Sequence, residues 1–145
     1  MRAVIAKACP ICGAKARGAD VNLETKLHPL PVFVAIDRFH FERALINLVS
    51  NAIEASGKGQ GVKIGITVGR DTLTIAAKDL GLGMDNRDTR ENIFTPFFTN
   101  KKHGSGLGMP IVKKIIEAHK GKIYVFSNPG GGTDAKVELP YKVIQ

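Results

Sequence analysis

The clearest pattern along the chain is a strict alternation of apolar and polar residues from Val62 to Val68. It stops at a polar turn, residues 69–71, and resumes from Leu73 to Ala77. A period of two is typical of strands that bury one face, so these residues predict a β-hairpin. The same period carries Asp79 to the buried face, where a carboxylate packs poorly and is better suited to reading a ligand.

Other segments repeat this pattern less completely. Residues 133–139 alternate apolar and charged positions after the glycine-rich turn at 129–132, and together with residues 122–127 they predict a second hairpin. Residues 21–25 alternate as in a half-buried strand. The apolar run at 32–36 favours either a strand or an extended segment.

A 3.6-residue period predicts a central helix that begins at the N-cap Asp37 and stops at Gly57. Its core face consists of Phe41, Leu45, Leu48, Val49 and Ala52. Asn47, Asn51 and Glu54 follow each other at i, i+4 and i+7 beside this face. Three polar side chains therefore project from one stripe of the helix.

Two more helices are predicted, one from Pro110 to His119 that ends at Gly121, and one within the alanine- and lysine-rich residues 2–17 that ends near Gly18. The apolar positions of the first are Ile111, Ile115, Ile116 and Ala118. Strands and helices are segregated along the chain. This favours an α+β fold, a two-layer α/β sandwich whose mixed, mostly antiparallel sheet is covered on one face by helices.

The composition is that of a soluble globular protein. A length of 145 residues fits one domain, 1–145, and no apolar run approaches the ~20 residues of a membrane span. Lys7 interrupts the apolar start, so we read no export signal and expect a cytoplasmic protein. The net charge of +8 suits a polyanion, but the basic residues are scattered without interleaved aromatics, so no nucleic-acid partner is expected.

Cys9 and Cys12 have the spacing of half a zinc site. A closed tetrahedral site needs four ligands, and the sequence has no second pair of cysteines. His28 and His40 are conceivable additions, but their spacing matches no standard pattern. We interpret the pair as thiols of a reduced cytoplasmic protein in an N-terminal helix or turn.

The polar stripe of the central helix suits a metal and a phosphate. The amide oxygen of Asn51 is a hard ligand appropriate for magnesium, and Asn47 can orient its waters or a triphosphate. Seen alone, the two residues would read as solvent-facing asparagines, although asparagine is a mediocre helix former.

Glycine-rich segments follow Asp79. Its carboxylate can accept a hydrogen bond from the exocyclic amine of adenine. Gly81 and Gly83 let the backbone approach a flat base. Any strand-to-turn junction can show the same pattern of residues. Residues 104–108 precede a helix and can cradle an anion or act as a hinge. The segment from Met84 to Gly104 is predicted to be a lid that orders on nucleotide.

Taken in order, these motifs resemble those of the ATP-binding domain of bacterial sensor histidine kinases. The resemblance runs from about residue 21 to 140. Its four boxes are Asn47–Ala52 (N box), Asp79–Gly83 (G1 box), Ile93–Phe98 (F box) and Gly104–Gly108 (G2 box).

The resemblance implies that Asn51 binds magnesium, that Asp79 reads adenine and that Lys101 touches the terminal phosphate. Asn47, Asn51 and Lys101 are the implied catalytic residues. The other residues implied to bind ATP are Ala55, Gly81, Gly83, Met84, Ile93, Phe94, Gly104, Ser105, Gly106, Leu107, Gly108 and Thr133. Glu54 stands where many relatives carry a basic residue near the phosphates, and its role stays open.

The implied function is to bind ATP with Mg²⁺ and to donate the γ-phosphate to a histidine on a separate phosphoacceptor (dimerisation) domain, with a response regulator as a further partner. No histidine here has the acidic and proline context of a phosphoacceptor, so the chain is expected to be a catalytic fragment and a monomer. Whether the parent protein is attached to a membrane stays open. This fragment itself is not expected to insert into a membrane.

The alternatives are an ATP hydrolase of the gyrase, Hsp90 or MutL kind, a serine kinase of the anti-sigma type, and a nucleotide-binding switch without catalysis. The resembling hydrolases carry a glutamate at the position of Asn47, whose amide is no useful general base.

Overall fold

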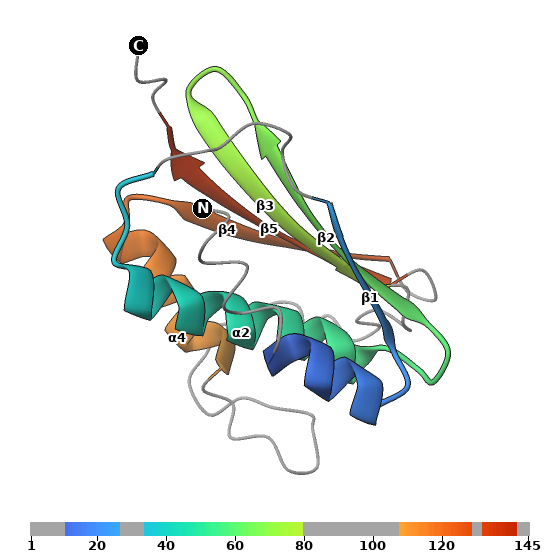
Figure 1. Ribbon diagram of the computed structural model, residues 1–145. Helices are drawn as coiled ribbons and strands as arrows, with labels where there is room; N and C mark the ends of the chain where they lie inside the picture. Colours follow the sequence, from blue (N-terminus) through green and yellow to red (C-terminus); the bar gives the residue numbers. More distant parts are fainter. Residues whose placement is uncertain (1–10, 27–33, 80–107, 129–131, 142–145) are drawn as a thin grey trace.

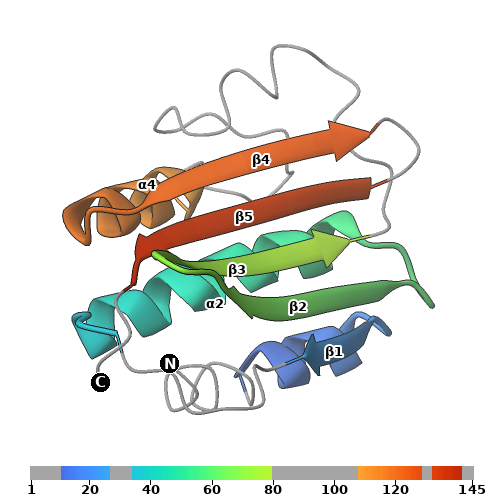
Figure 2. The same ribbon diagram turned by 90° about the horizontal axis from the view of Figure 1, so that it is seen from above.

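The computed structural model describes residues 11–26, 34–79, 108–128 and 132–141, and the following description concerns these residues. One mixed sheet has the strand order β1-β2-β3-β5-β4. Helices cover one of its faces (Figures 1 and 2), so the predicted two-layer α+β fold is confirmed. The elements are β1 (Asn22–Lys26), α2 (Arg38–Ala55), β2 (Gly61–Val68), β3 (Thr72–Asp79), α4 (Gly108–Ala118), β4 (Lys122–Asn128) and β5 (Gly132–Pro140).

Both predicted hairpins are present, β2 with β3 and β4 with β5, and β5 also pairs antiparallel with β3. Only β1 runs parallel to its neighbour, β2. The register places Ile66 opposite Ile75 and Ile75 opposite Val137, which gathers the alternating apolar residues on the helix-covered face. The alternation therefore predicted both the strands and the face that they bury.

Helix α2 follows its prediction closely. All five expected core residues are buried, together with Ala44 and Ile53. Asp37 is the N-cap, and its carboxylate accepts the backbone N–H of His40 at 3.1 Å. The helix ends at Ala55 with Ser56 as an extended C-cap, just before the predicted stop at Gly57.

The core face of α4 differs from the apolar positions named from the sequence. The buried residues are Met109, Val112 and Ile116, whereas Ala118 is exposed. Ile111 and Ile115 lie half-buried at the margin of the interface. Because α4 packs against both α2 and β4, its contact stripe is centred on the i, i+3, i+7 row that begins at Met109.

Residues 11–18 are helical and end at the expected place, Gly18. The C-terminal turn is closed by bonds from Val21 N–H to the Ala16 carbonyl and from Asp20 N–H to the Arg17 carbonyl, with Asp20 in the left-handed region at φ 56°. This is the Schellman arrangement, in which glycine is the usual left-handed residue.

Helix α4 ends in the same way, with Lys120 at φ 60°. The N–H groups of Gly121 and Lys120 bond the carbonyls of Ile116 and Glu117. Gly121, predicted to terminate the helix, is therefore not the left-handed residue. It is required for space, because a β-carbon there would lie 2.6 Å from the carbonyl oxygen of Glu138.

The apolar run at 32–36 does not form a strand in its described part, since residues 34–37 carry no regular secondary structure and lead directly into α2. Residues 32 and 33 lie outside the described part. None of the helices in the described ranges combines the length and the hydropathy of a membrane span.

Candidate functional site

Asn47 and Asn51 lie on consecutive turns of α2, and both are half-buried. Their neighbours Leu48, Val49 and Ala52 face the core and fix the rotation of the helix. The asparagines therefore occupy the margin of the interface instead of its solvent-facing side. This margin is where a helix can offer amides to a ligand while its apolar face stays packed.

Helix α4 is aligned with α2 through His119. The backbone N–H of Asp37 donates to His119 Nε2 at 2.8 Å, and His119 Nδ1 lies 2.7 Å from the carbonyl oxygen of Ile115. Since Nε2 accepts, Nδ1 carries the proton and donates to Ile115. The ring also meets Phe41 edge-on, with centroids 5.7 Å apart. The end of α4 is thus joined to the start of α2.

This contact sets the level of Gly108, the first residue of α4. The two helices pack side by side and run in opposite directions (Figure 1). Eleven residues of helix rise about 16 Å, which from Asp37 reaches the middle of α2, near Asn47. The N-terminus of α4, which carries a partial positive charge, lies at the level of the two asparagines.

Asp79 ends β3 and is only 2% exposed, the only buried charged residue among those described. The backbone N–H of Thr133, at the start of β5, donates to its Oδ1 at 3.2 Å. Burying a carboxylate is costly unless hydrogen bonds compensate for lost water. The structure therefore maintains an acceptor at the end of a strand where apolar side chains would pack more easily.

Several of these residues lie toward one end of the fold. Strand β3 runs toward the same end as the C-terminal half of α2, in both views (Figures 1 and 2). Asp79, Thr133 and Asn51 thus belong to the same end of the two-layer structure. Ala55, the last residue of α2, is exposed there.

The remaining predicted site residues lie outside the described part of the chain. They are Gly81, Gly83, Met84, Ile93, Phe94, Lys101, Gly104, Ser105, Gly106 and Leu107. The predicted lid from Met84 to Gly104 lies there as well.

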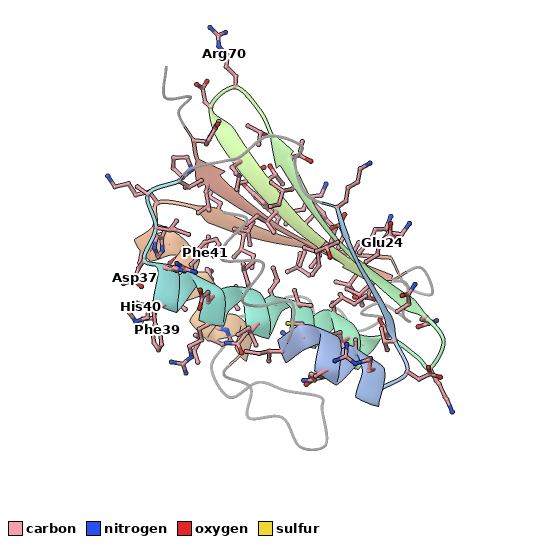
Figure 3. The ribbon with its side chains drawn as sticks, viewed as in Figure 1. Glu24, Asp37, Phe39, His40, Phe41 and Arg70 are labelled. Carbon is pink, nitrogen blue, oxygen red and sulfur yellow. The ribbon has the colours of Figure 1, made fainter. Side chains whose placement is uncertain are left out.

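The start of α2 carries a local electrostatic effect, in which the neighbouring side chains of Asp37 and His40 take part (Figure 3). The pKa of the Asp37 carboxyl is lowered from its ordinary value of 3.8, chiefly by the backbone N–H of His40 and then by the His40 side chain. His40 Nδ1 lies 3.1 Å from Asp37 Oδ2. This carboxylate caps α2 and is remote from Asp79, so its role is structural.

Sequence reasoning missed two contacts that position α2. His119 was considered only as a phosphoacceptor, and no local signal showed that it would bond to a residue 82 positions away. Glu54, whose role stayed open, forms an ion pair with Lys15 of helix 11–18. That partner comes from a helix whose position the sequence pattern did not define.

Cys12 lies on helix 11–18 in the hydrophobic core, 1% exposed. Cys9 is outside the described residues. His40 is engaged with Asp37 at the start of α2, and the described ranges contain no group of three or more potential metal-ligating residues of the His, Cys, Asp and Glu types. Cys12 therefore acts as a small apolar core residue.

Comparisons with known proteins agree with this geometry. The model of the histidine kinase-, DNA gyrase B- and HSP90-like ATPase family matches residues 36–143. The catalytic domain of the histidine kinase ThkA is 31% identical, with a TM-score of 0.86, over 98% of this chain and 93% of that domain. ThkA in complex with the response regulator protein TrrA is 29% identical, with a TM-score of 0.81, over 98% of this chain and 40% of that one.

A curated relative is the sensor protein FixL of Bradyrhizobium diazoefficiens, 35% identical over 130 residues. The match covers 88% of this chain and 26% of FixL. The chain thus spans about a quarter of the length of that relative.

Proposed function

Because the chain belongs to the family of histidine kinase-, DNA gyrase B- and HSP90-like ATPases, and its relatives include sensor histidine kinases, we propose that it is the catalytic domain of a protein histidine kinase. It binds ATP with magnesium and donates the γ-phosphate to a histidine on a separate phosphoacceptor domain in two-component signalling. We place this activity in a single domain, residues 1–145, with the motif-bearing core at about 21–140.

The observation that carries the proposal is the buried carboxylate of Asp79. It is 2% exposed and lies at a strand end, where its Oδ1 accepts the N–H of Thr133. A second oxygen of the same carboxylate is suited to accept the exocyclic amine of adenine, whereas guanine presents a carbonyl at that position. The arrangement supports selection of ATP over GTP.

We assign the phosphates of the bound nucleotide to the middle of α2. Asn51 would hold magnesium through its amide oxygen, and the metal would neutralise charge on the triphosphate. Asn47 would orient the phosphates, and the N-terminus of α4 at Gly108 would attract them. Lys101 is proposed to contact the terminal phosphate. Ala55 and Thr133 would line the nucleotide, with the G1, F and G2 residues named from the sequence.

Transfer is favoured over hydrolysis by the identity of residue 47. An amide cannot accept a proton usefully, so Asn47 cannot activate water as a carboxylate would. Phosphoryl transfer needs mainly positioning and charge neutralisation, because the acceptor supplies the nucleophile.

We propose two partners, the phosphoacceptor histidine domain of the parent protein and a response regulator. The likeness to ThkA, whose structure includes the response regulator TrrA, supports the second. The isolated chain is proposed to be a cytoplasmic monomer that binds no nucleic acid.

The test uses γ-labelled ATP with the full chain, alone and mixed with the phosphoacceptor domain of the parent protein. We expect label on a histidine of that domain and none on the chain itself. Label on a histidine of the chain alone would contradict the proposal. Rapid release of inorganic phosphate without an acceptor would favour the ATP hydrolase instead.

A further inference from the structure

The ion pair between Lys15 and Glu54 joins helix 11–18 to α2 across 39 positions of sequence. Both side chains remain partly exposed, at 40% and 37%. Exposed ion pairs contribute little to stability, so the main effect of this pair is not expected in the free energy of unfolding. The position of Glu54 on α2 indicates an effect on the nucleotide site instead.

Glu54 lies three residues after Asn51 on α2. Residues at this spacing are neighbours on the helix surface, with β-carbons about 5–6 Å apart. A magnesium ion on Asn51 would therefore bring the phosphates of its nucleotide close to a carboxylate. Like charges at such separations repel measurably at a partly solvated site, and the repulsion grows with each phosphate.

Lys15 is well fixed to oppose this repulsion. The turn after helix 11–18 is bonded to the segment after α2, where the N–H of Gly59 donates to the Asp20 carbonyl at 2.8 Å. The N–H of Asn22 donates to the Gln60 carbonyl at 2.9 Å. These bonds hold helix 11–18 beside the C-terminal part of α2 (Figure 1), so the Lys15 ammonium stays within reach of Glu54.

We propose that Lys15 is a positioning residue of the nucleotide site. Its ammonium neutralises the carboxylate of Glu54, which lies three residues from Asn51 on α2. Helix 11–18, which lies outside the family-matched residues 36–143, thereby sets the affinity for nucleoside triphosphates. This inference rests on the proposed function and deepens it, because it makes affinity depend on a second helix and on the number of phosphates.

The first experiment compares the full chain with its Lys15→Ala variant by calorimetry, using Mg-ATP, Mg-ADP and adenosine at low ionic strength. We expect ATP to bind about three- to tenfold more weakly to the variant, ADP to be affected less, and adenosine not at all. A loss of folding would weaken all three equally, so the order of the effects identifies the charge.

The matched control is Arg38→Ala. It removes one positive charge and one ion pair from the opposite end of α2, where Arg38 Nε lies 3.2 Å from Glu42 Oε1. Sixteen residues of helix place Arg38 about 24 Å from Glu54, beyond the Debye length of about 10 Å at 0.1 M salt. Its ATP affinity should equal that of the unmodified chain.

The second experiment uses Glu54→Gln. If Lys15 acts by neutralising Glu54, removing this carboxylate strengthens ATP binding, so the two single variants change affinity in opposite directions. If the ion pair only supports the fold, both variants weaken binding alike, and the inference is overturned. It is also overturned if Lys15→Ala binds ATP as the unmodified chain does. Failure of the unmodified chain to bind Mg-ATP would instead reject the proposed function, and this inference with it.

Discussion

Asp79 combines deep burial with a position at a strand end, where the chain could equally have placed an apolar residue. Its neighbours across the sheet show the contrast. Val62, its partner on β2, is completely buried and packs in the core. A carboxylate in this setting is maintained at a cost in desolvation, which is typical of side chains that recognise a ligand.

Replacing Asp79 by asparagine tests this recognition. The amide has nearly the same shape, but one acceptor oxygen becomes a donor group, so the side chain can no longer accept both the Thr133 N–H and the adenine amine. We expect ATP affinity to fall roughly ten- to a hundredfold, the loss of about 1.5–3 kcal/mol for one charge-assisted hydrogen bond. Calorimetry with ATP and GTP measures the change.

Asp134→Asn is the matched control. Asp134 pairs with Lys78 on β3 and faces away from the buried side, so its variant should bind ATP normally. Unchanged ATP affinity in Asp79→Asn would remove the adenine-reading role.

Single-residue properties were predictable where they followed from local periodicity. The period of two placed Asp79 on the buried face because β2 and β3 form an uninterrupted hairpin. The bond from His119 to the backbone of Asp37 was not predictable, since it depends on how two helices 82 residues apart cross. Its donor is a backbone N–H, a group that every residue except proline carries, so the sequence does not single it out.

The ends of helices also depend on contacts that local sequence does not predict. The sequence indicated correctly that α4 stops at Gly121, but not that the preceding residue, Lys120, takes the left-handed conformation. The reason is packing. Gly121 lies against β5 and Ile116, where no side chain fits, so the glycine is used for close approach and the preceding lysine takes the strained backbone conformation.

Gly121→Ala should therefore destabilise the protein. The new β-carbon would lie 2.6 Å from the Glu138 carbonyl oxygen, 2.8 Å from a Leu139 methyl and 2.9 Å from an Ile116 methyl. Backbone of β5 cannot move without disturbing the sheet, so we expect a loss of about 1–3 kcal/mol in the free energy of unfolding. Urea denaturation followed by circular dichroism measures it.

The control is Gly65→Ala on β2, where nothing lies within 4 Å of the added β-carbon. Its stability should be equal to or greater than that of the unmodified chain, because alanine loses less backbone entropy than glycine on folding. Equal stability of Gly121→Ala would show that the α4–β4 corner adjusts freely.

The start of α2 should give a pH dependence. The pKa of Asp37 is lower in the folded protein than its ordinary 3.8, so the ionised carboxylate stabilises the fold above that value. This contribution is lost as the pH falls below 3.8 and through the folded pKa. Asp37→Asn keeps a good N-cap but cannot ionise.

The measurement is thermal unfolding of the unmodified chain and Asp37→Asn from neutral pH to below pH 3.8. The unmodified chain should be the more stable at neutral pH, and the difference should shrink in acid. A difference independent of pH would show that His40 and the helix end do not stabilise the charge.

Elements were predictable when one face was buried and the period was complete, as in α2. The buried face of α4 was not predictable, because apolar residues occupy most sides of this helix. Which of them are buried depends on the angle at which α4 packs against α2 and β4. The parallel pairing of β1 with β2 also lay beyond local pattern, because residues 22–26 carry alternation but no information about direction.

For the molecule as a whole, the core extends beyond the family-matched residues 36–143. Cys12 and Ala16 of helix 11–18, and Val21 before β1, belong to the same buried cluster as α2 and the sheet. The N-terminal segment is therefore an integral part of the folded unit, which gives Lys15 a fixed place next to α2.

Because the proposed nucleotide site is assembled from α2, β3, α4 and β5, ligand binding should stabilise the whole fold. A ligand at about 100 times its dissociation constant adds about 2.7 kcal/mol, which for a domain of this size corresponds to a rise of roughly 10 °C in melting temperature. We expect this rise with ATP and magnesium, and a much smaller one with ATP and a chelator, because Asn51 is proposed to hold the nucleotide through the metal.

Asn51→Ala should abolish the difference between magnesium and chelator, whereas Asn22→Ala, which removes an exposed asparagine from β1, should preserve it. Each variant is compared with its own melting temperature without nucleotide, so that any change in intrinsic stability cancels. A magnesium-dependent rise of the same size in Asn51→Ala would assign the metal to other residues. It would leave Asp79 as the nucleotide contact, since adenine reading requires no metal.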